Sequence, residues 1–200
     1  MTRVVFFDAA HTLIDPYPPS ARVYAEIGIR HGHRVTEPGL AAALRPLWWS
    51  LRAQKAAVTA VSGTSEERER EWWHQLVDRA YRESGETGGV GEACFEDIYG
   101  HFARGSSWMV FPEVRAVLEA LRSRGVRACV LSNFDFRLRR VLEEHGLAPE
   151  FAHIFISSEV GWEKPSPRIY RAALEAAGVP PAQALMVGDE IGRASCRERV

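Results

Sequence analysis

Several polar side chains of this sequence follow short apolar runs, at positions where a parallel sheet usually carries its chemistry. They are Asp8 after VVFF, Ser132 and Asn133 after ACVL, Glu159 beyond HIFIS, and Asp189 after LMVG. Active residues gather at the carboxyl ends of parallel strands, which meet at one edge of the sheet. Each residue alone could cap a turn or a helix, but the set together predicts one site. Carboxylates there can act as nucleophiles or hold a hard cation.

A lysine in the segment GWEKPSPRIY, Lys164, adds a positive charge to this set. An ammonium group beside a carboxylate can neutralise it and can also bind an anionic substrate. Lys164 could equally be a surface charge. The other lysine of the chain, Lys55 in RAQKAAV, is expected to be an exposed residue of a helix.

The elements that must position these residues alternate between short apolar strands and helices. We expect strands at residues 3–7, 126–131, 152–157 and 184–187, and helices at residues 112–124, 136–145 and 167–177. Gly125, Gly146 and Gly178 follow the three helices, as glycine commonly does at a helix end. This alternation predicts an α/β fold, a Rossmann-like doubly wound parallel sheet.

A long helical insertion separates the first strand from the rest of the sheet. Helical segments are expected near residues 20–31, 37–57, 65–84 and 94–103. A plain connection needs only a few residues, so the insertion is expected to be a domain of its own. We assign residues 1–16 and 106–189 to the α/β core and residues 17–105 to a mainly α-helical cap.

Two features of the insertion have competing interpretations. The run SEERERE is expected to be a solvated helix start, with Ser65 or Thr64 as its N-cap. The pairs Trp48-Trp49 and Trp72-Trp73 could line a substrate entrance. Paired aromatic residues more often build a small core or a dimer face, which leaves a homodimer open.

Taken in order, these motifs resemble those of the haloacid dehalogenase superfamily. The first motif of that family, D-x-D-G-T, is similar to Asp8-Ala9-Ala10-His11-Thr12. Its second motif corresponds to Ser132 in VLSNFD, its third to Lys164 in EVGWEKPSPRIY, and its fourth to Gly188-Asp189. The resemblance extends from Arg3 to Asp189, and the insertion lies where one branch of the family carries a helical cap.

The resemblance implies a Mg²⁺-dependent hydrolase that acts on a small phosphorylated substrate through an aspartyl-phosphate intermediate. Asp8 is then the nucleophile, and Ser132 and Lys164 are catalytic residues that hold the phosphate. Asn133 and His11 are further phosphate-binding candidates, although Asn133 could equally cap the following helix.

The resemblance also implies a magnesium site. Its ligands are Asp8, Asp189 and the backbone carbonyl of Ala10, which are hard oxygen donors of the kind that Mg²⁺ prefers. The cation would lie between an anionic nucleophile and an anionic substrate that otherwise repel each other.

Ala10 departs from the family pattern, because phosphatases carry a second aspartate at this position. That acid protonates the leaving oxygen and later activates water, and such help is worth roughly a hundred- to ten-thousand-fold in rate. His11 replaces the usual glycine and could supply the proton, since imidazole titrates near neutral pH. It could also be a tolerated residue of a turn, which we favour.

Three alternatives to an ordinary phosphatase therefore stay open. Family members that cleave carbon–halogen bonds need no such acid, but they usually lack the acidic fourth motif found at Gly188-Asp189. Members that cleave phosphonates read D-x-A-G-T and require a cap lysine, for which Lys55 is the candidate. The chain could also be a catalytically weak protein that binds a ligand or a partner.

Composition and charge exclude other classes of function. Apolar residues make up 46% of the 200 residues, and the formal net charge of -1 gives no electrostatic basis for binding nucleic acid or an acidic membrane. Cys94, Cys129 and Cys196 have neither paired nor metal-ligand spacing, and no signal region or membrane-spanning run is visible. We expect a cytoplasmic protein with a small-molecule partner.

The last eleven residues, EIGRASCRERV, differ from the rest of the sequence. They are identical to the translation of a common sequencing-library adapter read with one base in front. We therefore expect residues 190–200 to be a non-native tail and the core to be truncated at about Asp189.

Overall fold

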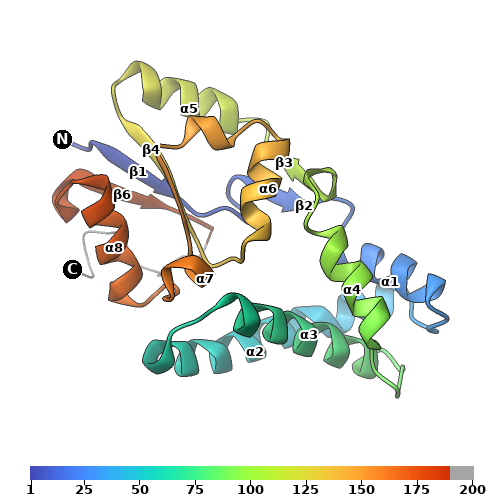
Figure 1. Cartoon of the computed structure of the whole chain (residues 1–200). Helices are drawn as coiled ribbons and strands as arrows, with labels where there is room; N and C mark the ends of the chain where they lie inside the picture. Colours follow the sequence, from blue (N-terminus) through green and yellow to red (C-terminus); the bar gives the residue numbers. More distant parts are fainter. Residues whose placement is uncertain (190–200) are drawn as a thin grey trace.

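The central sheet has four parallel strands in the order β5-β4-β1-β6 (Figure 1). The computed structural model describes residues 1–189. Its sheet consists of β1 (Val4–Phe7), β4 (Arg127–Ser132), β5 (His153–Ile156) and β6 (Ala184–Val187). Val4 in β1 lies in register with Arg127 on one side and Ala184 on the other. The α/β fold with a parallel sheet that the sequence predicts is confirmed.

Both faces of this sheet are covered, because alternate residues of β1 point in opposite directions. Val4 and Phe6 belong to a buried cluster with α8, whereas Val5 and Phe7 belong to a second cluster with α5 and α6. A strand has a period of two, so a strand buried on both faces needs an unbroken apolar run. The core helices are α5 (Val114–Ser123), α6 (Arg137–Glu144), α7 (Ser157–Val160) and α8 (Pro167–Ala177).

Four helices make up the long insertion, and α2 and α3 pack side by side beneath the sheet in the view of Figure 1. They are α1 (Ser20–Arg30), α2 (Glu37–Ser62), α3 (Glu66–Glu83) and α4 (Glu92–His101). α2 runs to Ser62 instead of ending near residue 57, and it ends where Gly63 takes a φ of 70°. Ser65 caps α3 by accepting from the Arg68 amide, as one expectation had it. The exact division into core and cap remains our proposal.

A short antiparallel pair, which the sequence analysis does not predict, joins the two ends of the insertion. β2 (Ile14–Pro16) pairs with β3 (Trp108–Val110), with Pro16 opposite Trp108. Proline is tolerated at the end of a short edge strand, so Pro16 can end β2. The chain therefore leaves the core and returns to it at one place.

Three short 3-10 helices complete the described chain: η1 (Gly105–Ser107), η2 (Ala148–Glu150) and η3 (Pro181–Gln183). Within residues 1–189, none of the helices combines the length and the apolar character needed to cross a membrane. The interpretation of residues 190–200 as a non-native tail, Cys196 included, concerns residues outside those described and stays a prediction.

Candidate active site

The Asp8 carboxylate is held from both sides at the end of β1. Its Oδ1 accepts hydrogen bonds from Ser132 Oγ at 2.7 Å and from the Ala9 amide at 2.8 Å. Its Oδ2 lies 2.7 Å from Lys164 Nζ, in an ion pair whose two side chains are 15% and 5% exposed. The backbone amide of Asp8 donates to the Val187 carbonyl at 2.8 Å. These bonds fix the orientation of one carboxylate against a hydroxyl and an ammonium group.

Asn133 holds the backbone that carries Lys164. Its side-chain oxygen accepts from the Lys164 amide at 2.7 Å, and its side-chain nitrogen donates to the Lys164 carbonyl at 2.8 Å. The segment also contains a cis bond between Lys164 and Pro165. Asn133 thus joins the end of β4 to the Lys164 segment instead of capping α6.

One cavity of about 480 Å³ brings the predicted site residues together. Its lining includes all but one of the residues that the sequence predicts for the site, namely Asp8, Ala10, His11, Ser132, Asn133, Lys164 and Asp189. Glu159 does not line it; this residue lies in α7 and pairs with Arg139 at 2.6 Å near the surface. Because β5 ends at Ile156 and a helical turn follows, Glu159 is carried away from the edge where the other residues meet.

The turn after Asp8 explains part of the first motif. His11 has a φ of 58°, in the left-handed region that favours glycine, and the family pattern has glycine here. The amides of Thr12, Leu13 and Ile14 all donate to the Ala9 carbonyl, which makes a tight turn. The His11 ring is 55% exposed and its Nδ1 lies 2.6 Å from Asp15 Oδ1. These contacts favour the role of a turn residue.

The oxygen donors in the cavity fit a hard cation that keeps part of its water shell. Asp8, Ala10 and Asp189 all line the cavity. The chain passes close to Asp8 at Gly188, where an added Cβ would be 3.4 Å from the Asp8 Cβ. Within residues 1–189, no group of three or more His, Cys, Asp or Glu side chains is arranged as a metal site. The donor set predicted from the sequence, two carboxylates and a backbone carbonyl, stays a prediction.

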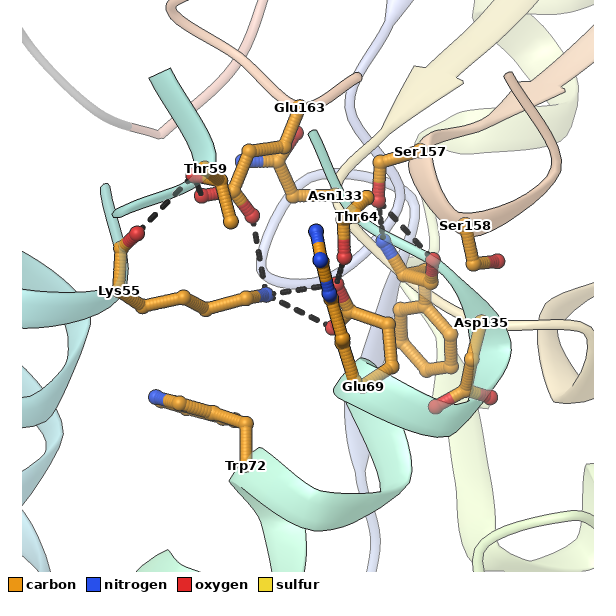
Figure 2. A network of polar contacts seen from close by, with 12 residues as sticks. Lys55, Thr59, Thr64, Glu69, Trp72, Asn133, Asp135, Ser157, Ser158 and Glu163 are labelled. Atoms are coloured by element: carbon orange, nitrogen blue, oxygen red, sulfur yellow. Dashed lines mark hydrogen bonds and ion pairs between the residues drawn. The ribbon is translucent and has the colours of Figure 1, made fainter. Parts of the chain in front are cut away.

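A buried ionic network joins the helical insertion to the core beside this site (Figure 2). Lys55 Nζ lies 2.7 Å from each carboxylate oxygen of Glu69 and 2.9 Å from Glu163 Oε2. Thr64 donates to Glu69 at 2.6 Å, and the Thr59 hydroxyl donates to Glu163. Burial raises the pKa of Glu69, and the neighbouring ammonium of Lys55 opposes this rise.

The network corrects two expectations about the insertion. Lys55 is not an exposed helix residue, because its side chain is 13% exposed and lines the cavity. The SEERERE run is not simply solvated, because Glu69 is buried and Glu66 accepts from Ser158 and from the Phe136 amide. Both were missed because the residues that bury them lie on the core, about a hundred positions later in the sequence. The one feature of the sequence that could have pointed to Lys55 was the scarcity of lysine, since the chain has only two.

The tryptophan pairs of α2 and α3 both line the cavity and pack against each other. The Trp48 ring lies 5.2 Å from that of Trp72 and 5.7 Å from that of Trp73, measured between ring centroids. Trp49 also lines the cavity but is 59% exposed. The two interpretations of these residues, a substrate entrance and a small core, therefore describe the same surface.

Comparisons with known proteins agree on one family. The family profile described as haloacid dehalogenase-like hydrolase matches residues 2–194. Haloacid dehalogenase-like hydrolase domain-containing protein 3 of Bos taurus is 31% identical over 192 residues, which cover 96% of this chain and 75% of that protein. A phosphoserine phosphatase of Thermus thermophilus is 39% identical over 120 residues, which cover 59% of this chain and 48% of that protein.

Solved structures give the same fold. The crystal structure of the L-2-haloacid dehalogenase RSc1362 has a TM-score of 0.70 at 28% identity, covering 94% of this chain and 78% of that one. The defluorinating L-2-haloacid dehalogenase Rha0230 has a TM-score of 0.73 at 21% identity, covering 96% and 75%, and shows a likeness of fold alone. Proteins similar to this chain thus include both phosphate- and halide-releasing enzymes.

Proposed function

Because this chain belongs to the haloacid dehalogenase-like hydrolase family, and is therefore a hydrolase, we propose that it is a Mg²⁺-dependent phosphatase. Its substrate is a small phosphorylated metabolite, and the reaction passes through an aspartyl-phosphate. The observation that carries the proposal is the presence of Asp8, Asp189 and Lys164 in one cavity. A carboxylate nucleophile and an anionic substrate repel each other, so positive charge must lie between them.

Asp8 attacks phosphorus through one carboxylate oxygen. A bond forms between that oxygen and phosphorus while the bond from phosphorus to the leaving oxygen breaks. Water then attacks the acyl-phosphate, which releases inorganic phosphate and returns the Asp8 carboxylate. The Ser132 hydroxyl and the Lys164 ammonium, each 2.7 Å from Asp8, bind phosphoryl oxygens, and Asn133 fixes the backbone of Lys164.

Asp8, Asp189 and the Ala10 carbonyl would hold the magnesium ion. A bound ion of this kind neutralises charge on the transferred phosphoryl group. Ala10 itself offers no proton, and the His11 ring is engaged with Asp15. The chain's own residues therefore bind and orient the phosphate, with no second carboxylate at position 10.

The test is phosphate release by the full chain from a panel of small phosphomonoesters, with Mg²⁺ and with a chelator. The wild type should release phosphate, and the chelator should stop it. Asp8→Asn should reduce the rate to background, because an amide oxygen is a poor nucleophile. Asp97→Asn, at an exposed position outside the cavity, is the control. Turnover by Asp8→Asn at the wild-type rate would refute the assignment.

Cleavage of a carbon–halogen bond is the second candidate. Ala10 favours it because halide leaves without a proton, and the RSc1362 dehalogenase shares the fold at 28% identity. The position of Asp189 in the cavity argues against it, because family members that cleave carbon–halogen bonds usually lack this acidic residue. Halide release from 2-chloropropionate that depends on Asp8, resists the chelator and occurs without phosphatase activity would replace the phosphatase proposal.

Phosphonate cleavage and ligand binding without catalysis would each give a different experimental result. Phosphonate cleavage would use Lys55, which lines the cavity although two carboxylates hold its ammonium group. Borohydride trapping with phosphonoacetaldehyde would then label wild type and not Lys55→Arg. A binding protein would gain thermal stability with phosphate esters and show no turnover.

A further inference from the structure

Two features of the cavity are not explained by phosphate binding alone. Position 10 has no acid to protonate a leaving group, and the side of the cavity formed by α2 and α3 carries four tryptophans. Each feature constrains the part of the substrate that departs, and not the phosphate. The two constraints are independent, since one concerns acidity and the other concerns shape.

The shape constraint comes from the tryptophans of the insertion. Trp48 and Trp49 on α2 and Trp72 and Trp73 on α3 all line the cavity that contains Asp8 and Lys164. The Trp72 and Trp73 ring centroids are 5.0 Å apart, in an edge-to-face arrangement. Such a surface favours flat aromatic groups, which pack against ring faces and edges.

Positive charge accompanies these rings. The Arg52 guanidinium lies 5.4 Å from the centre of the Trp48 ring, and both residues line the cavity. Charge that develops on a leaving oxygen is stabilised by cations that are already in place. Positive charge therefore lies on the same side of the cavity as the tryptophan rings.

The acidity constraint follows from Ala10. A phenol has a pKa of about 10, as in the tyrosine side chain, whereas water and simple alcohols have a much higher pKa. An alkoxide therefore needs a proton as it departs, but a phenolate can leave without one. A site without an acid at position 10 should discriminate strongly between these two leaving groups.

We propose that the substrates of this site are aryl phosphates, in which phosphate is esterified to an aromatic hydroxyl. This inference rests on the proposed phosphatase function and goes beyond it by naming the leaving group. An Asp8 oxygen forms the bond to phosphorus, and the bond from phosphorus to the aryl oxygen breaks. The electron pair leaves with that oxygen as phenolate, which takes a proton from water, and a second water later releases phosphate from Asp8.

The experiment compares phenyl phosphate with benzyl phosphate in the full chain with Mg²⁺. Both carry the same ring, but benzyl phosphate must release an alkoxide. We expect kcat/KM for phenyl phosphate to exceed that for benzyl phosphate by about a hundredfold or more, the range of the missing acid. Because Ala10 also removes the base for the second step, phenol should appear in a burst followed by slow turnover.

Two variants separate acidity from shape. Ala10→Asp restores an acid and should raise kcat/KM for benzyl phosphate at least tenfold, while kcat/KM for phenyl phosphate changes little and its slow turnover after the burst becomes faster. Trp49→Ala, at an exposed cavity position, should raise KM for phenyl phosphate several-fold. Phe136→Ala removes an aromatic ring of similar exposure outside the cavity and should leave the kinetics unchanged.

The possible outcomes test the aryl phosphate inference separately from the proposed phosphatase function. Equal kcat/KM for phenyl and benzyl phosphate, or no gain for benzyl phosphate in Ala10→Asp, would overturn the aryl assignment and leave the phosphatase standing. Unchanged phenyl phosphate kinetics in Trp49→Ala would remove the aromatic argument. If no phosphate ester in the panel is hydrolysed in a manner that depends on Asp8, both fail.

Discussion

At the scale of single residues, the Asp8 carboxylate is the centre of the site, and each neighbour has a separable role. Ser132 and Lys164 contact different oxygens of Asp8, whereas Asn133 contacts only the backbone of Lys164 among these residues. Substitution of each neighbour should therefore give a different kinetic defect.

Ser132→Ala should lower kcat for phosphate release by about a hundred- to a thousandfold, the cost of losing one placed hydrogen-bond donor to developing charge. The hydroxyl is buried and is one of two hydrogen-bond donors to Asp8 Oδ1, so its loss also weakens the hold on the nucleophile. Ser123→Ala, whose hydroxyl bonds a helix carbonyl at the surface, is the control and should be neutral. Steady-state kinetics measure both, and a Ser132→Ala rate within threefold of wild type would contradict the assigned role.

His11→Gly should keep kcat/KM within about threefold of wild type and raise the melting temperature. Glycine adopts the left-handed φ of 58° without steric cost, whereas other residues lose roughly 1 kcal/mol there. A large loss of activity in His11→Gly would instead identify His11 as the missing acid.

At the scale of elements, the junction of α2 and α3 is the place where the helical insertion rests on the core. The Thr64 amide donates to the Gly161 carbonyl at 3.0 Å, and a Cβ built on Gly63 would overlap that same carbonyl oxygen. Glu66 and Glu163 add polar contacts across the same junction. The core residues of this junction, Gly161 and Glu163, directly precede Lys164 in the sequence.

Gly63→Ala should destabilise the protein by about 1–3 kcal/mol more than Gly85→Ala, which is the range for overpacking a tight contact. Both glycines have positive φ, at 70° and 104°, so both variants carry backbone strain. Added atoms at Gly85 meet nothing within 4 Å, so the difference reports the contact with Gly161. Chemical denaturation measures it, and equal losses would show that the contact contributes nothing.

The sequence predicted the elements whose cause is local and missed those whose cause is distant. α8 and β6 were predicted to the residue because Pro167 and Gly178 bound the helix and an apolar run forms the strand. The β2–β3 pair was missed because each strand has three residues and depends on a partner more than ninety positions away. α7 was missed because a single turn of helix has no periodicity.

The residues of the candidate site also separate into those with a local cause and those with a distant one. The convergence of Asp8, Ser132 and Asp189 could be predicted because strand ends meet at one edge of the sheet. Lys164 follows no strand directly, and its likeness to the third motif of the family predicted its place. The Lys55 network could not, because burial of Glu69 and Lys55 depends on how the insertion docks against Glu163. Sequence periodicity places a residue on a helix face, but it does not state which other element that face will meet.

At the scale of the whole molecule, the buried carboxyl of Glu69 makes stability depend on pH. Its pKa is raised above the ordinary value of 4.5, chiefly by burial, so the folded protein keeps a proton that the unfolded chain releases. Stability falls with rising pH wherever the folded state binds more protons. The contribution of Glu69 is thus greatest below about pH 4.5 and is lost as pH rises through the folded-state value.

The unfolding free energy of wild type relative to Glu69→Gln should therefore decrease as pH rises from about 4.5, because glutamine does not titrate. Glu67→Gln, at an exposed position of the same helix, should show no such trend. Denaturant titrations at several pH values measure both differences. A difference for Glu69→Gln that is constant with pH, or that increases, would contradict the raised pKa.

The placement of the two lysines has a practical consequence. The side chains of Lys55 and Lys164 are 13% and 5% exposed, and both line the cavity. The chain has no other lysine, so an amine-specific acylating reagent can modify only these two side chains and the α-amino group of Met1. The rate at which the two lysines are labelled, read by mass spectrometry against the α-amino group, therefore times the opening of the cavity in the unmodified protein. Protection by a bound substrate or by inorganic phosphate would report occupancy of the site before any substrate has been identified.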